Sequence, residues 1–183
     1  MARYEIDTAH STIGFSARHM MFTTVRGHFT EFEGQVEVEG DDYSTAHGEV
    51  KIRTASVNTN SGQRDDHLRS ADFFAADKFP EITFTSTSVK PKGDEFLVNG
   101  DLTLHGVTRP VELVVGIEGR VAKDAFGKER VGISAKGKIN RKDFGLNWNM
   151  ALETGGVLVS ETINLEIEAA FTAAANVVAG APA

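Results

Sequence analysis

Hydrophobic and polar residues alternate along most of this chain. In one stretch Val111, Leu113, Val115 and Ile117 occupy every second position. The same spacing recurs in residues 13–19, 96–104, 131–139 and 163–171. In the first two ranges the alternating residues are Ile13, Phe15, Ala17 and His19, and Phe96, Val98, Gly100, Leu102 and Leu104. In the last two they are Val131, Ile133, Ala135, Gly137 and Ile139, and Ile163, Leu165, Ile167, Ala169 and Phe171. A period of two is typical of strands with one buried face and one solvated face. Such strands usually belong to antiparallel sheets.

Three more segments read as strands: residues 25–39, 48–53 and 82–89. In the first of them Phe29 and Phe32 are three positions apart, which breaks the alternation. A β-bulge between them would bring both rings to one face. We therefore predict one long, bulged strand over residues 25–39.

The number of strands and the shortness of most connections predict an all-β fold. Turn signals such as GDDYS, KPKGDE and HGVTRP separate the segments. About eight strands of this kind favour an extended antiparallel barrel, because closure removes exposed sheet edges. Glycines within the strands fit the tight bends of a barrel: Gly14, Gly34, Gly100, Gly116 and Gly137. A β-sandwich is the alternative.

Residues 60–79 do not alternate, and we interpret them as a short helical insertion. Asn60 or Ser61 can cap its start, Ser70 can cap a second turn, and Pro80 ends it. Its charged residues, including Asp65, are interpreted as a solvated face with local ion pairs. Its apolar residues, Leu68, Phe73 and Phe74, must be buried, so the segment is predicted to act as a stopper or gate.

The inward faces of the predicted barrel carry large apolar residues next to small ones. Ala17, Gly100, Ala135, Gly137 and Ala169 would leave room between the larger side chains. An eight-stranded barrel is about wide enough for one small ligand, or for its own side chains. The candidate ligand-binding residues are Phe15, Ala17, His19, Phe29, Phe32, Leu68, Phe73, Phe84, Phe96, Leu102, Ile133, Ala135 and Ile167. The alternative is that these residues fill a dry core.

Composition and charge narrow the function classes. The chain has 183 residues, enough for one domain with a full core, and a net charge of −7, which argues against a nucleic-acid partner. It has no cysteine, so disulfides and thiolate chemistry are excluded. There is no membrane-spanning apolar run and no leader-like start, so a cytoplasmic location is expected.

Candidate chemistry is weak outside the apolar interior. Six histidines show none of the usual metal-ligand spacings, so no metal site or other cofactor is predicted. No nucleophile elbow is present, and Asp65, Asp66 and His67 would point in different directions on a helix. No catalytic residue is predicted. Basic residues near the strand ends and the helix could contact a diphosphate, although a solvated ion pair is the better interpretation of each: Arg18, Arg26, Arg64, Arg69, Arg109, Arg141 and Lys142. Arg141 is expected to pair with Asp143.

Several blocks of this sequence, in order, resemble the YceI-like family of polyisoprenoid-binding, lipocalin-like proteins. They are YEIDTAHSTIGFSARHM, VRGHFTEFEG, ASVNTNSGQRDDHLRSADFFAADKFPEITFTS, VNGDLTLHGVTRPVEL and KINRKDFGL. The resemblance implies an eight-stranded, lipocalin-like barrel with an interior tunnel for a long isoprenoid, and a homodimer. It implies no short motif of site residues.

The function expected from pattern and resemblance together is binding, carriage or storage of a long apolar amphiphile. A polyisoprenoid, an isoprenoid quinone and a fatty amide are the ligands considered. The alternatives are an enzyme that acts on a lipid-like substrate in the same cavity and a structural or stress-response protein with a filled core. The barrel domain is placed at residues 1–172, and residues 173–183 are expected to form a disordered tail.

Overall fold

In a computed structural model of the chain, strands predominate, and the structure describes residues 1–153 and 155–175. The strands are β1 (Ala2–Ile6), β2 (Thr12–His19), β3 (Thr23–Phe29), β4 (Phe32–Glu39), β5 (Asp42–Arg53), β6 (Val57–Asn58), β7 (Glu81–Lys92), β8 (Glu95–Leu104), β9 (Val107–Val121), β10 (Arg130–Asn140) and β11 (Thr162–Ala173). The helices are α1 (Gly62–Arg69) and three 3-10 turns, η1 (Thr8–His10), η2 (Thr54–Ser56) and η3 (Arg141–Phe144).

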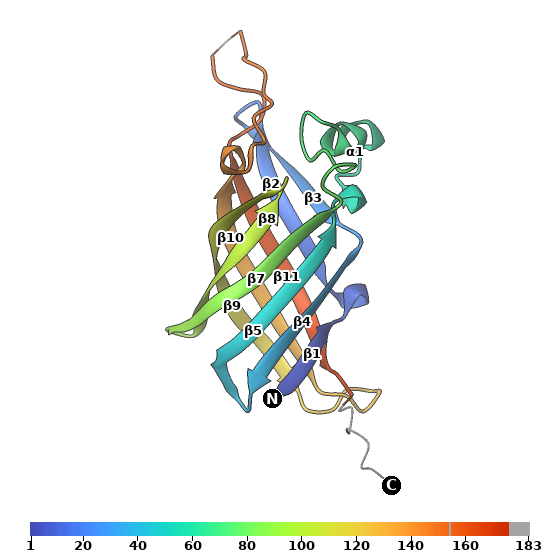
Figure 1. Ribbon diagram of the computed structural model, residues 1–183, viewed down its shortest axis with the longest axis vertical. Helices are drawn as coiled ribbons and strands as arrows, with labels where there is room; N and C mark the ends of the chain where they lie inside the picture. Colours follow the sequence, from blue (N-terminus) through green and yellow to red (C-terminus); the bar gives the residue numbers. More distant parts are fainter. Residues whose placement is uncertain (154, 176–183) are drawn as a thin grey trace.

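All strand pairings between these elements are antiparallel, and eight strands close into a barrel. Around the ring the order is β1-β4-β5-β7-β8-β9-β10-β11, and β1 pairs back to β11. The same edge of β11 also pairs with β2, farther toward its start, and β2 continues into β3 and β6. The predicted eight-stranded antiparallel barrel is therefore confirmed, with a three-stranded branch at its upper end (Figure 1).

The prediction of one bulged strand over residues 25–39 is wrong. The chain forms β3 and β4 instead, and Thr30 and Glu31 lie between them. The amide of Thr30 donates to the Ser56 carbonyl, and the amide of Arg53 donates to the Glu31 carbonyl. These long-range bonds hold the turn between β3 and β4. The turn, and not a bulge, accounts for the three-residue spacing of Phe29 and Phe32. The strand β1 was not predicted from the sequence at all.

The insertion after β6 contains one two-turn helix followed by turns, rather than helix throughout. Ser61 caps α1 by accepting a hydrogen bond from the Arg64 amide at 3.3 Å, and Ser70 Oγ accepts from the Asp72 amide at 3.3 Å. Asp65 is buried, which corrects its expected solvated position. It accepts hydrogen bonds from the Thr59 amide at 2.8 Å and the Thr59 hydroxyl at 2.6 Å. The helix is thereby attached to Thr59, the residue that directly follows β6.

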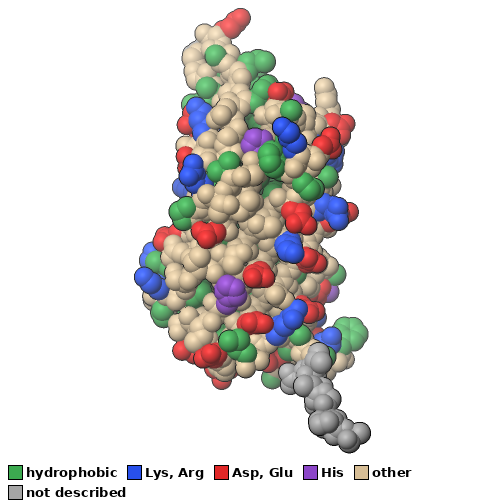
Figure 2. Space-filling model, in the orientation of Figure 1, with side chains coloured by type: hydrophobic (Ala, Val, Ile, Leu, Met, Phe, Trp, Pro, Cys, Tyr) green, Lys and Arg blue, Asp and Glu red, His purple; other side chains and the backbone are tan. Residues whose placement is uncertain are grey.

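The outer face of the barrel carries the polar members of each alternating strand. On the side shown in Figure 2, acidic and basic side chains are interspersed, and hydrophobic side chains are scattered. Cross-strand ion pairs such as Arg26 with Glu166 at 3.4 Å lie on this outer surface. The alternation read from the sequence therefore separates an apolar interior from a charged exterior.

Candidate ligand-binding cavity

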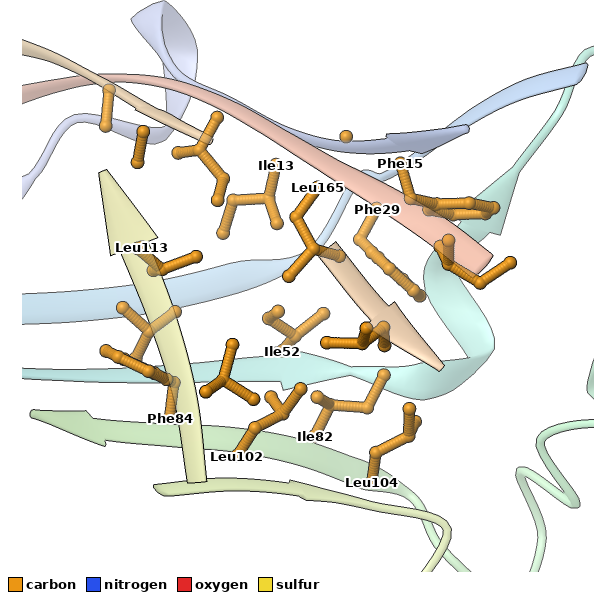
Figure 3. Close-up of a pocket in the computed structure, with 18 of the residues that line it drawn as sticks. Ile13, Phe15, Phe29, Ile52, Ile82, Phe84, Leu102, Leu104, Leu113 and Leu165 are labelled. Carbon is orange, nitrogen blue, oxygen red and sulfur yellow. The ribbon is translucent and has the colours of Figure 1, made fainter. Parts of the chain in front are cut away.

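The barrel contains a cavity of about 710 Å³ that is lined mainly by the inward side chains of the strands and, at its upper end, by residues of the insertion and of the segment between β10 and β11. In Figure 3 the side chains of Ile13, Phe29 and Leu165 face those of Ile52, Phe84 and Leu102 across this space. The volume lies within the range of small-molecule pockets, which are typically about 300–1,000 Å³. The interior is therefore a hollow apolar site, and the dry, filled core considered from the sequence is not what forms.

Twelve of the thirteen predicted ligand-binding residues line the cavity: Phe15, Ala17, His19, Phe29, Leu68, Phe73, Phe84, Phe96, Leu102, Ile133, Ala135 and Ile167. Phe32 does not belong to the lining, and it packs instead against the buried cluster that includes Phe29 and Ile52. It is the first residue of β4 and sits opposite Ile52. Phe32 therefore lies on the same face of the sheet as Ile52 and belongs to the packed cluster at the start of β4 rather than to the cavity wall.

Two of the small residues expected to leave room are covered by a neighbouring side chain. A Cβ atom at Gly100 would lie 2.3 Å from Cζ of Phe84, and one at Gly137 would lie 2.7 Å from Cδ2 of Leu113. The two glycines thus make space for a phenylalanine and a leucine rather than for a ligand. Ala17, Ala135 and Ala169 do line the cavity.

A buried arginine organises the upper end of the cavity. Arg141, which follows β10, is 2% exposed and lines the cavity. Its Nε donates to the Ser160 carbonyl at 2.8 Å, and its Nη1 donates to the Leu146 and Trp148 carbonyls, both at 2.8 Å. The expected pair with Asp143 does not form, because the guanidinium points into the segment that joins η3 to β11. These bonds hold that segment over the barrel mouth.

An aromatic contact joins this segment to the helical insertion. The ring centroid of Trp148 lies 4.8 Å from that of His67 and 5.2 Å from that of Phe73. His67 Nε2 is 2.9 Å from Asp72 Oδ2, so its ring is held in place. All three aromatic residues line the cavity. The insertion and the 141–161 segment therefore meet across the upper end of the barrel.

The turn between β2 and β3 contributes a third part of the upper end. Met20 and Met21 adopt positive φ angles of 50° and 71°, a backbone region in which such side chains are uncommon. Met20, Met21 and Phe22 are all exposed, and the Met20 amide donates to the Leu158 carbonyl at 2.9 Å. In this hairpin His19 pairs with Thr23, and His28 pairs with Gly14. The two histidines are therefore not cross-strand neighbours.

The lower end of the barrel is held together by ion pairs. Arg130 pairs with Asp7 at 2.5 Å and with Asp124 at 3.1 Å, and Arg120 pairs with Asp41 and Glu129. The Arg130 guanidinium, with a further contribution from His10, lowers the pKa of Asp7 to about 2. The pKa of Asp124 is also lowered, first by the backbone amide of Lys128 and further by Arg130.

Among the residues that the structure describes, no group of three or more histidine or carboxylate residues is arranged to hold a metal ion. Within the same residues, α1 and the 3-10 turns are too short and too polar to traverse a lipid bilayer. What the geometry offers is an apolar cavity with its polar lining residues gathered mainly at the upper end.

The model of the YceI-like domain family matches residues 4–171. The chain belongs to the YceI family. A relative, UPF0312 protein SAS2572 of Staphylococcus aureus, is 38% identical over 172 residues, which are 94% of this chain and 98% of that protein.

Solved structures agree with this family membership. The crystal structure of Campylobacter jejuni YceI has a TM-score of 0.73 and is 34% identical, with 85% of this chain and 88% of that one covered. A polyisoprenoid-binding domain from Saccharophagus degradans shares the fold at a TM-score of 0.67 and 19% identity, covering 93% of this chain and 98% of that one. The predicted family resemblance is therefore confirmed.

Sequence reasoning missed two residues at the upper end of this YceI-family cavity. From the sequence, Arg141 is one basic residue among several near strand ends, and no pattern assigns Trp148 to the cavity. Arg141 lies in the NRKDFGL block, which is one of those that resemble the family. The residue types in that block do not indicate which backbone carbonyls Arg141 bonds. Trp148 is the single tryptophan of the chain, and that rarity was the available signal.

Proposed function

We propose that this protein binds a long apolar amphiphile in its barrel, and that it carries or stores the ligand rather than transforming it. The observation that supports the proposal is the cavity of about 710 Å³, whose strand-derived walls are apolar on every side. Each methylene moved from water into such a site contributes about 0.8 kcal/mol. Burial of the tail alone can therefore provide most of the binding free energy.

The family relationship supports a lipid-like ligand. One structural relative is described as a polyisoprenoid-binding domain. A polyisoprenoid, an isoprenoid quinone and a fatty amide all combine a long apolar chain with a small head, as the cavity requires. We propose that the ligand belongs to this group, with the tail among Phe84, Leu102 and Ile133.

The insertion is proposed to gate the cavity. Leu68 and Phe73 line the cavity, and the neighbouring Arg69 donates to the Ala55 carbonyl at 2.8 Å and to the Val57 carbonyl at 3.2 Å. These bonds attach the insertion to η2 and β6, while its contact with the opposite side of the mouth is aromatic. Opening would separate Trp148 from His67 and Phe73 and leave the attachment intact.

The direct test is native mass spectrometry of protein purified without detergent, followed by organic extraction. A lipid recovered in a one-to-one ratio is the expected result. Protein that emerges empty, and that also takes up no isoprenoid or fatty ligand added in solution, would reject the proposal. Turnover of an added lipid would favour an enzyme instead.

A blocking variant tests the position of the site. Ala135 lines the cavity between Ile167 on β11 and Val115 on β9, so Ala135→Phe places a ring in the ligand's space. We expect lipid uptake to fall at least ten-fold while the circular dichroism spectrum is retained. Lys136→Phe is the matched control, because the same ring then projects from the outer face of the same strand. Equal uptake by both variants would place the ligand elsewhere.

The family resemblance also leads us to propose a homodimer. Sedimentation velocity of the purified protein measures its mass in solution, and a monomer at micromolar concentration would contradict this part of the proposal. The binding proposal does not depend on it.

A further inference from the structure

The charged residues in the cavity lining are all of one sign. Of the residues that the structure places around the cavity, Arg18, His19, Arg64, His67 and Arg141 carry basic groups, and none is an aspartate or a glutamate. The whole chain has 26 acidic residues against 19 lysines and arginines. Acidic residues outnumber basic ones in the whole chain, whereas the cavity lining contains basic residues and no acidic ones.

These basic residues are connected around one end of the cavity. Arg141 bonds the Trp148 carbonyl, and the Trp148 ring contacts His67. Arg64 is three residues before His67 on α1, which places both on the same side of the helix. On the other side, His19 forms a β-bridge with Val159, whose carbonyl accepts a hydrogen bond from Arg141 at 3.4 Å.

The charge of Arg141 is not cancelled by a carboxylate. Its hydrogen bonds go to backbone carbonyls, and no ion pair to it is found in the described part of the chain. Burial lowers the pKa of Arg141, and the charge of Glu161 offsets this in part. Buried charges are ordinarily paired, and an arginine stays protonated, so a positive potential persists beside the cavity.

Nearby carboxylates are already engaged with other partners. Glu161 pairs with Lys142 at 2.8 Å, and Asp72 holds His67 Nε2. Meanwhile a charged donor remains at the mouth. Arg64 uses Nε and Nη2 to bond Thr59, which leaves Nη1 free to donate. The upper end thus combines a spare charged donor with the positive charge of Arg141, which no carboxylate of the described residues pairs.

We propose that this group of residues is a head-group subsite that selects amphiphiles with an anionic head, a carboxylate or a phosphate, while the tail extends into the barrel. The inference rests on the proposed lipid-binding function and specifies its ligand class. Charge-assisted hydrogen bonds are about twice as strong as neutral ones, so the sign of the head should matter more than its size.

The test compares hexadecanoate, hexadecanol and hexadecylamine, which share one tail and differ in head charge at neutral pH. Affinities are measured by displacement of the neutral dye Nile red. We expect hexadecanoate to bind about ten-fold or more tightly than hexadecanol, and hexadecylamine to bind more weakly than either. Equal affinities, or a preference for the amine, would overturn the subsite and leave the lipid-binding function intact. Absence of binding by all three would overturn both.

Two variants locate the effect, and two small anions separate head from tail. Arg64→Gln and His19→Gln should each reduce the preference for hexadecanoate over hexadecanol several-fold, with the affinity for hexadecanol unchanged. Arg26→Gln removes the same charge from the outer face and should change neither. A preference that survives both mouth variants would overturn the assignment. Acetate and inorganic phosphate should not compete at hexadecanoate concentrations, and competition would show a free-anion site instead.

Discussion

At the lower end of the barrel, two arginines are paired with four carboxylates, whereas at the upper end the buried Arg141 bonds backbone carbonyls. The lower end thus satisfies its charges with its own side chains and joins β1, the β4–β5 turn and the segment before β10. At the upper end the Arg141 guanidinium has no carboxylate partner among the described residues, and Arg64 keeps one guanidinium nitrogen without a bond. The lower end is therefore cross-linked by ion pairs, and the proposed head-group subsite lies at the other end.

Backbone conformation shows the same contrast. The lower-end turns place Gly40 and Gly127 at positive φ, where glycine has little strain. The upper-end turn places Met20 and Met21 there instead. Strain of this kind is concentrated at functional sites, because elsewhere it costs stability without a benefit. The strained Met20 and Met21 turn therefore agrees with the proposed position of the ligand's head group at the upper end.

The largest expected effect concerns Arg141. Replacing it by methionine keeps an apolar stem of similar length but leaves the carbonyls of Leu146, Trp148 and Ser160 without their donor. We expect Arg141→Met to lower the free energy of unfolding by about 2–4 kcal/mol in urea denaturation. Lys142→Met is the control, because it removes one exposed ion pair, which is worth about 0–1 kcal/mol. Similar losses in both variants would show that the carbonyl bonds do not support the upper end.

An intermediate effect tests the lower end through its pH dependence. The folded-state pKa of Asp7 is about 2, below its ordinary value of 3.8, chiefly because of Arg130. The Asp7 carboxylate therefore stabilises the fold above its ordinary pKa, and this contribution disappears as pH falls from 3.8 toward 2. Screening at this partly exposed site leaves about 1–2 kcal/mol at neutral pH.

Asp7→Asn should lack this component of the acid-induced loss of stability, measured by urea titrations between neutral and acidic pH. The exposed Asp77→Asn variant should follow the unmodified protein. If Asp7→Asn lost stability with falling pH as steeply as the unmodified protein does, the Arg130 pair would not be holding the lower end.

The smallest expected effect concerns the strained turn. Met20 has a φ of 50°, and asparagine is better tolerated in that region. Met20→Asn should raise stability by about 0.5–1 kcal/mol, seen as a higher midpoint in thermal unfolding. Met150→Asn replaces another exposed methionine without a positive φ and should change stability by less than about 0.5 kcal/mol. A melting temperature that falls in the first variant would show that Met20 makes contacts that outweigh its strain.

Much of the wall could be predicted from the sequence. The strands β2, β8, β9, β10 and β11 are predicted correctly, because alternating hydrophobic and polar residues indicate which face of a strand is buried. Ten of the twelve predicted residues that line the cavity lie on strands and follow from this alternation, whereas Leu68 and Phe73 belong to the insertion. Contact of these twelve residues with a ligand stays a prediction. The errors arose where alternation stops. A bulge and a strand break produce the same three-residue spacing, so the turn between Phe29 and Phe32 could not be predicted. Phe32 lies on the inward face but packs into a cluster, and alternation does not distinguish that position from the cavity wall.

The ends of the barrel could not be predicted in this way. Arg141 donates to the carbonyls of Leu146, Trp148 and Ser160. Every residue has a backbone carbonyl, so the sequence does not indicate which carbonyls an arginine will bond. Gly137 shows a related limit, because its missing side chain is filled by Leu113 on β9. The sequence predicts a disordered tail from residue 173 onward, yet Ala173 ends β11, and residues 176–183 lie outside the described part of the chain.

The sequence by itself determined the all-β class, the apolar interior and the family, because each depends on the order of residue types along a strand. Tertiary structure alone decided that the interior is hollow, that Phe84 and Leu113 cover the wall glycines, and that the basic lining residues meet at the upper end. These features depend on which side chains come together from strands far apart in the chain. The closure of β1 onto β11 sets that arrangement, and local pattern contains no information about it.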